Sequence, residues 1–381
     1  MTKLSDVLII GGGVGGLLTA LQASPRKVTI LEKDYRDFGL AKRILVSGNG
    51  RANFFNAALL DSKRYLDPML SSFKDIVFSD GQNYAESLLS YLESLGFSSY
   101  QEGDLFYPFF NRSECLHSCL LKALRKTETE VIGGEAYKVD RKNKKVFYYN
   151  ADNRKEEISY KELVVSVGGR SYDRDDFSYS LLDSLSVPYY PYSPCLCPLV
   201  TKERIPSYLA KNRIKGTVSL YQEDRLISKE EGEVIFKDDG LSGISVFNLT
   251  LSINELIRLK KDQNIKIHIS YLSHDNTSIS KKEGRNSLPS FLEKYLRDRN
   301  YGYGEDLIFT FDSLYPFRFS QTSYGGVLLK EIDLNDMSLP KDHDIHLLGE
   351  CLDQTFICGG YNMGLALIEG YKTGLKIRSK L

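Results

Sequence analysis

The segment from Val7 to Gly16, taken together with Glu32, constrains the fold of this chain more than any other. The apolar run VLII leads directly into GGGVGG, and a second apolar run, VTIL, ends at Glu32, 21 residues after Gly11. This order predicts a buried parallel strand, a glycine turn, a helix and a second strand that ends in an acid. Such a unit is typical of Rossmann domains that bind a dinucleotide.

Each glycine of this turn has a separate structural task. Gly11 allows the tight turn, Gly13 lets the backbone approach a pyrophosphate, and Gly16 lets the helix pack closely on the strand. The N-terminus of the helix then offers N–H groups and a partial positive charge to the phosphates. Glu32 lies where an acceptor for a ribose diol is expected, and its carboxylate would repel a 2′-phosphate. We therefore expect FAD or NAD rather than NADP.

Composition bounds the class of protein. At 381 residues the chain is long enough for two or three domains, and its 50 basic and 50 acidic side chains cancel. Bulk charge therefore does not indicate a nucleic-acid partner, although a local basic patch stays open as the alternative. The basic cluster of Lys281, Lys282 and Arg285 is expected to be a solvated face rather than an RNA contact. The first apolar run is too short for a signal peptide and none reaches transmembrane length, so we expect a cytoplasmic chain with no membrane partner.

Periodicity and turn residues predict the elements between the two ends. We expect helices at Gln82–Leu95, Glu114–Lys126 and Leu288–Arg299, a hairpin at Phe97–Phe109, and strands at Glu130–Asp140, Lys144–Asn150, Glu156–Tyr160, Glu162–Val167 and Asp344–Leu348. Short β-like segments dominate from Leu199 to about Ser270, and four prolines between residues 188 and 198 indicate a linker or domain edge. This order predicts a nucleotide domain built from both termini, with roughly residues 190–320 inserted as a second domain.

A second strand–glycine–helix unit is missing from the sequence. Gly302 and Gly304 have neither an apolar strand before them nor a third glycine at the required place. Reductases that hold both FAD and NAD(P)H usually give each its own Rossmann unit. We therefore expect one resident dinucleotide, FAD, with NAD(P)H at most a transient partner and with another reductant or oxygen as the alternative.

Four further segments resemble one bacterial flavoprotein family. KRILVSGNGRAN (42–53) is similar to its KLLISGGGRCN signature, SVGGRSY (166–172) to its ATGGKSY turn, and SYGGV (323–327) to its TAGGV. GECLD (349–353), followed by CGGYN (358–362), resembles its carboxy-terminal flavin motif. This is the NAD(P)/FAD-dependent oxidoreductase family, also labelled aminoacetone oxidase family FAD-binding enzyme.

The resemblance implies an α/β fold in which a Rossmann-type FAD-binding domain, built from both termini, is interrupted by a β-barrel-like insert with a small helical subdomain. The implied boundaries are 1–187 for the first part of the FAD-binding domain, 188–322 for the inserted substrate or cap domain, and 323–381 for the second part. It also implies an enzyme, an FAD-dependent oxidoreductase. Activities proposed in the family include oxidation of small amines, reduction of a steroid carbon–carbon double bond and reduction of ribosomal RNA uridine to dihydrouridine.

From this we expect hydride transfer between flavin N5 and a small organic substrate. The alternative is flavin-dependent reduction of rRNA uridine, and a third hypothesis is FAD held as a sensor or scaffold without turnover. Ala52 stands where the family usually has cysteine, so no thiol can donate a proton there. This departure counts against the rRNA alternative.

Candidate cofactor contacts come from the glycine turns and their polar neighbours. They are Gly11, Gly13, Gly16, Glu32, Lys42, Gly48, Asn49, Gly50, Arg51, Gly168, Gly169, Gly349, Glu350, Asp353, Gly359, Gly360, Tyr361 and Asn362. Gly359 and Gly360 should begin a helix whose dipole stabilises negative charge at the pyrimidine edge of reduced flavin. Arg51 offers bidentate hydrogen bonds to a pyrophosphate or polarises a substrate, with loop bracing as its alternative role. The candidate catalytic residues are Tyr324, Tyr361 and Arg51, the tyrosines as substrate contacts or proton relays.

Cysteine and histidine give no further site. The six cysteines form no CxxC pair and no metal-ligand spacing, so we expect neither a metal nor a redox disulfide. Cys115 and Cys119 are expected as small core residues, and Cys351 and Cys358 are expected to pack rather than react. His343 and His346 are expected at the solvent edge of the strand that leads to Glu350.

Overall fold

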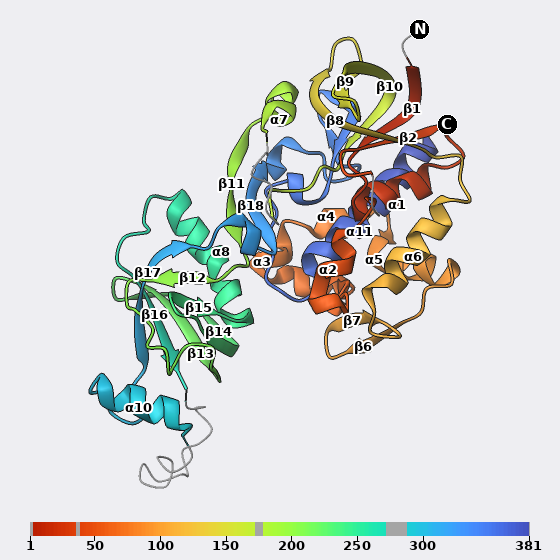
Figure 1. Cartoon of the computed structure of the whole chain (residues 1–381). Helices are drawn as coiled ribbons and strands as arrows, with labels where there is room; N and C mark the ends of the chain where they lie inside the picture. The colour runs from red at the N-terminus through yellow and green to blue at the C-terminus, as the bar shows by residue number, and fades with distance from the viewer. Residues whose placement is uncertain (1–2, 36–38, 172–177, 272–287, 381) are drawn as a thin grey trace. The chain divides into compact units, whose positions relative to one another are not determined.

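The computed structural model describes residues 3–35, 39–171, 178–271 and 288–380 (Figure 1). The chain divides into two compact units. As far as these ranges are described, the first unit contains Met1–Gly169, Asp176–Tyr192 and Gly325–Leu381, and the second contains Arg170–Asp175 and Ser193–Tyr324. The first unit is therefore assembled from both ends of the chain, and the second from its middle.

A largely parallel sheet forms the centre of the first unit. Its strands are β1 (Lys3–Ile10), β2 (Val28–Glu32), β8 (Glu130–Asp140), β9 (Lys145–Asn150), β10 (Lys155–Val165), β19 (Ser338–Leu339) and β20 (Asp342–Leu347). β1 pairs in parallel with β2 and β10, β2 with β8, and β10 with β20. The last four residues of β1 are buried, which explains the unbroken apolar run in its sequence. The predicted Rossmann-type α/β fold is confirmed.

The sheet has a switch point beside β1. After β1 the sheet continues through β2 on one side, whereas after β10 the next strands, β20 and β19, extend it on the other side. Open α/β sheets bind ligands in the crevice outside the carboxyl ends of two such strands. Gly11, which follows β1, and Ser166, which follows β10, therefore mark where a ligand site is to be sought.

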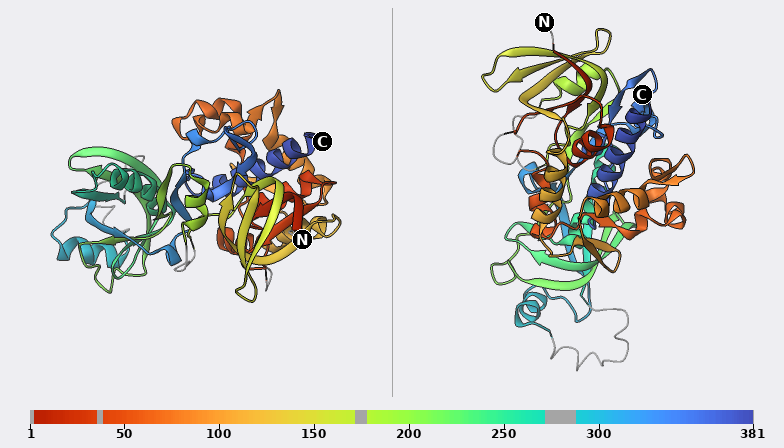
Figure 2. Two further views of the ribbon diagram at one scale, coloured as in Figure 1. Left: turned by 90° about the horizontal axis from the view of Figure 1, so that it is seen from above. Right: turned by 90° about the vertical axis from the view of Figure 1, so that its right-hand side faces the viewer.

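Helices from the two ends of the chain lie side by side on this sheet (Figures 1 and 2). The helices of the unit are α1 (Val14–Ala23), α2 (Arg43–Val46), α3 (Pro68–Ser71), α4 (Lys74–Val77), α5 (Tyr84–Ser94), α6 (Ser113–Leu124), α7 (Ser180–Leu185) and α11 (Tyr361–Ser379). A Cβ on Gly370 of α11 would lie only 2.2 Å from the carbonyl oxygen of Gly15 of α1, and Thr19 Oγ1 donates to the Gly370 carbonyl at 3.2 Å. Within the described ranges, no helix combines the length and apolar character that crossing a membrane requires.

Small strand pairs complete the first unit. They are β3 (Phe55–Asn56) with β7 (Leu105–Pro108) and β6 (Ser99–Glu102), and β4 (Phe78–Ser79) with β5 (Gln82–Asn83). The predicted hairpin at Phe97–Phe109 forms as β6 and β7. It lies directly after α5, whose predicted C-terminal glycine, Gly96, has a φ of +88°.

In its described residues, the second unit is a closed barrel that carries the helices α8 and α10 (Figures 1 and 2). Its strands are β12 (Leu199–Thr201), β13 (Arg213–Gln222), β14 (Arg225–Phe236), β15 (Gly240–Ser242), β16 (Ile265–Ser270) and β17 (Leu307–Leu314), and its helices are α8 (Ile244–Arg258) and α10 (Ser290–Asp298). Val246, Leu249 and Ile253 of α8 are fully buried in the same hydrophobic core as the inward residues of the strands. Burial of this face holds the helix on the barrel.

Three sequence expectations differ from the structure. Short β-like segments were expected to dominate from Leu199 to about Ser270, and no helix was expected there, yet this stretch contains the 15-residue helix α8. The two strands expected on either side of Lys161 form one strand, β10, because its first half pairs with β9 while its second half continues beside β1. The proline-rich stretch expected as a linker or domain edge contains the boundary between the two units, at residues 192 and 193, but it forms strand β11 (Tyr189–Cys195), which pairs with β18 (Thr322–Val327).

Candidate functional site

The first glycine turn lies against the end of β10. Gly11 has a φ of +97°, and a Cβ there would lie 2.4 Å from the carbonyl oxygen of Ser166. A Cβ on Gly16 would lie 2.2 Å from the carbonyl oxygen of Gly11, whereas a Cβ on Gly13 would have its nearest neighbour, Ser166 O, 3.9 Å away. Two glycines are therefore required by packing, and Gly13 opens onto free space. This is the distribution that a backbone approached by a pyrophosphate requires.

Helix α1 begins at this open glycine. Gly13 is its N-cap residue and brings no side-chain hydrogen bond to the first turn. The first N–H groups of a helix lack partners within the helix, and the helix dipole adds a partial positive charge there. The end of α1 is therefore suited to an anion such as a phosphate.

Glu32 is buried beside the turn, with 8% of its surface exposed. One carboxylate oxygen accepts the Gly12 N–H at 2.6 Å, and the other accepts the Asp34 N–H at 2.9 Å. Because each carboxylate oxygen has two lone pairs, both can accept a further hydrogen bond. The predicted role of Glu32 as a ribose acceptor fits this geometry and stays a prediction.

Two basic residues follow, and only one was singled out from the sequence. Lys42 is exposed and pairs with Asp34 at 2.6 Å. Arg43, which sequence reasoning missed, donates from Nη1 to Glu350 at 2.9 Å, and the same Nη1 lies 3.8 Å from a Cβ built on Gly168. Arg43 thus joins three predicted cofactor-binding segments. The sequence could have indicated Arg43, because it is a basic residue inside the KRILVSGNGRAN segment, directly after the predicted contact Lys42.

The SGNG segment forms a short 3-10 helix, Ser47–Gly50, in which Gly48 and Gly50 have positive φ angles. Ala52 is fully buried and has a φ of +52°. Arg51 is about half exposed and contacts the β6–β7 hairpin. Its guanidinium donates to Asn111 Oδ1 at 2.9 Å and lies 4.3 Å from the centre of the Tyr107 ring. Arg51 therefore braces a hairpin here, which was the alternative role considered from sequence; its proposed contact with cofactor or substrate stays a prediction. The side chain of Asn49 lies outside the described residues.

The segment after β20 carries the second acidic group. Gly349 has a φ of +76°, Glu350 is half-buried beside Arg43, and the Asp353 N–H donates to the Val327 carbonyl at 2.7 Å. The Gly349 N–H donates to Glu369 Oε2 at 2.6 Å. Glu369 is fully buried on α11 and was not anticipated, although an acid between Ile368 and Gly370 in an apolar helix is a signal that could have been found.

Helix α11 begins beside residues 53–56, which follow the SGNG segment. Gly360 is its N-cap, with a φ of +84° and no side-chain cap, so the helix offers its first N–H groups as α1 does. A Cβ on Gly360 would lie 2.6 Å from the Phe55 carbonyl oxygen, and Asn56 Nδ2 donates to the Gly359 carbonyl at 2.8 Å. With its amide oxygen turned toward α11, Asn53 accepts the Gly360 N–H at 3.3 Å. The start of α11 therefore lies against residues 53–56, whereas Gly15 of the amino-terminal glycine cluster contacts α11 further along, at Gly370.

The last predicted residues divide between the two units. Asn362 forms two hydrogen bonds with the backbone of Phe356, at 2.9 and 3.0 Å, and so braces the loop before the helix. Tyr361 is half-buried, and burial raises the pKa of its phenol. Tyr324 belongs to the second unit, where its hydroxyl donates to Glu255 at 2.6 Å and Arg258 lies 4.3 Å from its ring centre. Catalytic roles for Tyr324 and Tyr361 stay predictions.

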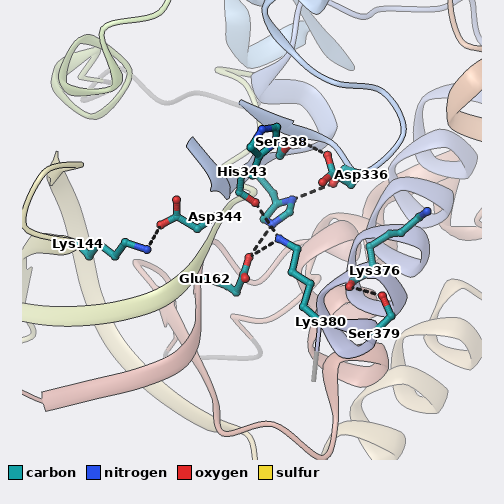
Figure 3. A network of polar contacts seen from close by, with 10 residues as sticks. Lys144, Glu162, Asp336, Ser338, His343, Asp344, Lys376, Ser379 and Lys380 are labelled. Atoms are coloured by element: carbon teal, nitrogen blue, oxygen red, sulfur yellow. Dashed lines mark hydrogen bonds and ion pairs between the residues drawn. The ribbon is translucent and has the colours of Figure 1, made fainter. Parts of the chain in front are cut away.

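The expectation that His343 and His346 lie at a solvent edge is wrong for His346, which is fully buried. Its Nε2 lies 3.0 Å from Glu162 Oε2 and its Nδ1 lies 2.8 Å from the Asp336 carbonyl oxygen. Lys380 also donates to Glu162 at 3.0 Å, as Figure 3 shows. Packing of β20 against β10 places His346 opposite Val164 inside the sheet, which the strand's polar sequence did not reveal.

The cysteines divide into a buried and a half-buried group. Burial raises the pKa of Cys195 to about 11 and those of Cys197 and Cys351 to about 12, so these thiols stay protonated at neutral pH. Cys115 and Cys119 were expected in the core, but they are half-buried and line a surface groove with Gly96 and Lys122. The buried stripe of α6 is instead formed by Leu116, Leu120 and Leu124. The basic cluster at 281–285 and Tyr172 lie outside the described residues.

Comparison with known proteins places this site in a family. The model described as HI0933-like protein Rossmann domain matches residues 5–376. The chain belongs to this family. It is an oxidoreductase of a Rossmann-fold flavoenzyme group, as the resemblance in its sequence motifs implied.

Two curated relatives match over nearly their full lengths. The 3-dehydro-bile acid delta(4,6)-reductase of Clostridium scindens is 25% identical over 413 aligned residues, which cover 97% of this chain and 98% of the relative. The ribosomal RNA dihydrouridine synthase of Haemophilus influenzae is 24% identical over 422 aligned residues, which cover 99% of each chain. Among solved structures, the 3-ketosteroid-delta4-(5alpha)-dehydrogenase of Rhodococcus jostii shares the fold, with a TM-score of 0.53, 12% identity and coverage of 99% of this chain and 97% of that one.

Proposed function

We propose that this chain binds FAD at the carboxyl ends of β1 and β10 and transfers a hydride between flavin N5 and a small organic substrate. The observation that carries the proposal is that α1 and α11 pack on each other and that each begins at a glycine without a side-chain cap, Gly13 and Gly360. The glycines around these two helix starts have Cβ positions that are either sterically closed or open, as a cofactor requires. Family membership supports the same conclusion.

The residues of the crevice fit the parts of FAD. Gly13 and the N-terminus of α1 would receive the pyrophosphate, and Glu32 would accept hydrogen bonds from a ribose. The N-terminus of α11 would place its positive dipole end where negative charge develops on the ring. Bound FAD supplies a ring whose N5 exchanges a hydride with the substrate. Tyr361, whose phenol stays protonated because burial raises its pKa, would donate a hydrogen bond or proton.

Within this class we propose reduction of a carbon–carbon double bond conjugated to a ketone as the first reaction to test. The support is the Clostridium scindens relative, whose name specifies a delta(4,6)-reductase of a 3-dehydro-bile acid. Oxidation of a small amine is the other small-molecule reaction that the motif resemblance suggests.

The experiment is an anaerobic titration of purified protein. We expect the protein to take up FAD and show the absorption bands of oxidised flavin. We expect NADH or NADPH to bleach them, and an enone to restore them faster than buffer alone. A colourless protein that takes up no added FAD would refute the cofactor assignment. The substrate class would be refuted if no enone reoxidised the flavin reduced by NAD(P)H and no amine bleached the oxidised flavin.

Reduction of rRNA uridine is the second candidate, favoured by the full-length Haemophilus influenzae relative. Ala52 removes the thiol that the motif comparison would have offered as a proton donor. Mass spectrometry of rRNA from a deletion strain decides this: lost dihydrouridine supports the second candidate, and unchanged rRNA rejects it.

A further inference from the structure

We propose that Glu369 is a positioning residue that holds the Gly349–Asp353 turn in its cofactor-binding conformation and makes FAD affinity depend on pH near neutrality. This inference rests on the proposed binding of FAD. It concerns a side chain that no sequence motif singled out, on the face of α11 that lies beneath the turn.

Both oxygens of the Glu369 carboxylate face hydrogen-bond donors. Oε2 accepts the Gly349 N–H at 2.6 Å, and Oε1 accepts from Gln354 Nε2 at 2.7 Å. Gln354 Nε2 also donates to the Gly349 carbonyl at 3.0 Å. The Glu369 carboxylate and the Gln354 amide thus hold the two ends of the turn on α11. Glu369, Gln354 and Gly349 are all buried.

The turn that they hold contains the predicted cofactor contacts. Gly349 has a φ of +76°, which glycine adopts without strain, so its hydrogen bonds rather than its backbone preference select this conformation. The next residue, Glu350, pairs with Arg43 at 2.9 Å, and a Cβ built on Gly168, in the β10 loop, lies 3.8 Å from Arg43 Nη1. Displacement of Gly349 would therefore disturb Glu350, Arg43 and the β10 loop together.

Protonation of Glu369 conflicts with this arrangement. The carboxylic acid carries an O–H that must donate, but both groups that face its oxygens are donors. One of the two hydrogen bonds is lost when the proton is added, and the turn loosens. We therefore infer that the ionised form is the one that binds FAD tightly.

Burial opposes ionisation of the Glu369 carboxyl and brings its deprotonation close to neutral pH. Burial raises the pKa of Glu369 to about 7, despite the hydrogen bonds from Gly349 and Gln354 and the positive charge of Lys372. Of the other groups packed here, Cys351 stays protonated, and α1 contributes Gly15 and Thr19, which carry no charge. Burial also lowers the pKa of Lys372 to about 8, but its ammonium donates to the carbonyl oxygens of Asp75, Ile76 and Leu334 and not to the turn. Of these ionisable groups, the carboxyl of Glu369 is therefore the one that hydrogen-bonds the turn.

The test measures the dissociation constant of FAD between about pH 6 and pH 8 for the full-length apoprotein. We expect wild-type affinity to rise about tenfold over this range, with a midpoint near pH 7. Glu369→Gln should bind weakly at every pH, because an amide can satisfy only one of the two donors. Glu203→Gln is the matched control, since Glu203 also accepts a backbone N–H and a side-chain hydroxyl, both from Thr310, but does so in the barrel. Glu203→Gln should leave the dependence of FAD affinity on pH as it is in wild type.

A second variant keeps the inference testable if Glu369→Gln does not fold. Gln354→Met removes one donor from the carboxylate, so the pKa of Glu369 should rise and the midpoint of FAD binding should move to higher pH. A profile identical to wild type in this variant would overturn the inference, as would tighter binding by wild type at lower pH.

Hydrogen exchange of the apoprotein separates this inference from the proposed function. After correction for the pH dependence of the chemical exchange rate, residues 349–354 should exchange more slowly at about pH 8 than at about pH 6 in wild type only. Tight FAD binding with no pH dependence refutes the role of Glu369 and leaves the proposed function intact. Absence of FAD binding at every pH refutes the proposed function and the cofactor half of this inference, whatever the exchange shows.

Discussion

Gly13 and Gly16 are three residues apart yet should respond differently to an added methyl group. Gly13 has a φ of −68° and open space at its Cβ, so Gly13→Ala should fold with nearly wild-type stability. The methyl group would occupy the approach of the pyrophosphate and weaken FAD binding by about tenfold or more. Gly16→Ala would place its Cβ 2.2 Å from the Gly11 carbonyl oxygen and should lower the free energy of unfolding by about 1–3 kcal/mol.

Thermal unfolding without cofactor and FAD titration with cofactor distinguish these two effects. Equal loss of stability in both variants would contradict the assignment of Gly13 to the ligand rather than to packing.

Glu162 should make the protein sensitive to acid. Burial by itself would raise the pKa of Glu162, but the hydrogen bonds from His346 and Lys380 outweigh it and hold the pKa below the usual 4.5 (Figure 3). A depressed pKa in the folded state contributes stability that is complete above the unfolded value and is lost as the pH falls through the folded value. Glu162→Gln should therefore cost about 3 kcal/mol near pH 7, with a smaller difference from wild type below about pH 4.

Urea unfolding across pH measures this difference. Exposed Glu135, which pairs with Lys33 at 2.8 Å, provides the control, and Glu135→Gln should change stability by less than about 1 kcal/mol. A Glu162→Gln deficit that stays constant down to low pH would contradict the ionic origin of the effect.

Residue-level reasoning from the sequence succeeded where a residue's role depends on its backbone neighbours. The turn and packing tasks given to Gly11 and Gly16 agree with their surroundings, because a glycine turn between a strand and a helix has few solutions, whereas the pyrophosphate contact of Gly13 stays a prediction. Arg43 and Glu369 were missed, since each acts through partners about 300 and 20 residues away along the chain. Sequence spacing carries no information on such contacts.

At the scale of elements, α11 is fixed by a buried lysine. Lys372 is fully buried, and its ammonium donates to the carbonyl oxygens of Asp75, Ile76 and Leu334 at 2.7–3.1 Å. Lys372→Met would leave three carbonyls without this donor and should lower the free energy of unfolding by about 3 kcal/mol.

Lys376, one turn further along α11, provides the matched control. It pairs with Asp80 at the surface, so Lys376→Met should cost less than about 1 kcal/mol. Denaturant unfolding of both variants measures the contrast. Equal small losses would show that the three carbonyls find other partners when the ammonium is removed.

Helices and strands were predicted well where the local pattern of apolar residues identified them. They were predicted poorly where burial by the rest of the unit decided between helix and strand. β8 has the predicted bounds, and α5 and α6 lie within two residues of theirs. Helix α8 was missed because its segment is rich in β-branched residues, which favour strands by propensity. Its buried residues, Val246, Leu249, Ile253 and Leu256, follow a helical spacing that the closed barrel buries.

At the scale of the whole molecule, FAD should stabilise the first unit in particular. At a free concentration about 100 times its dissociation constant, a ligand adds about 2.7 kcal/mol to the unit that binds it. We expect FAD to slow hydrogen exchange most in residues 11–16 and 349–362, with little effect on β13 and β14 of the barrel. Exchange measured by mass spectrometry with and without FAD checks this, and protection centred on the barrel would contradict the proposed site.

The sequence by itself determined the glycine turn, the parallel strands and the family, because these depend on residues close together in the chain and on their order. The tertiary structure alone decided which side chains lie beneath the Gly349–Asp353 turn and which surround the buried His346. Pairing of β10 with both β1 and β20, and packing of α11 on α1, bring Glu369 to Gly349 and Glu162 to His346. Burial then sets the charge of these groups, and burial is a property of the folded chain because it depends on residues from every part of the sequence.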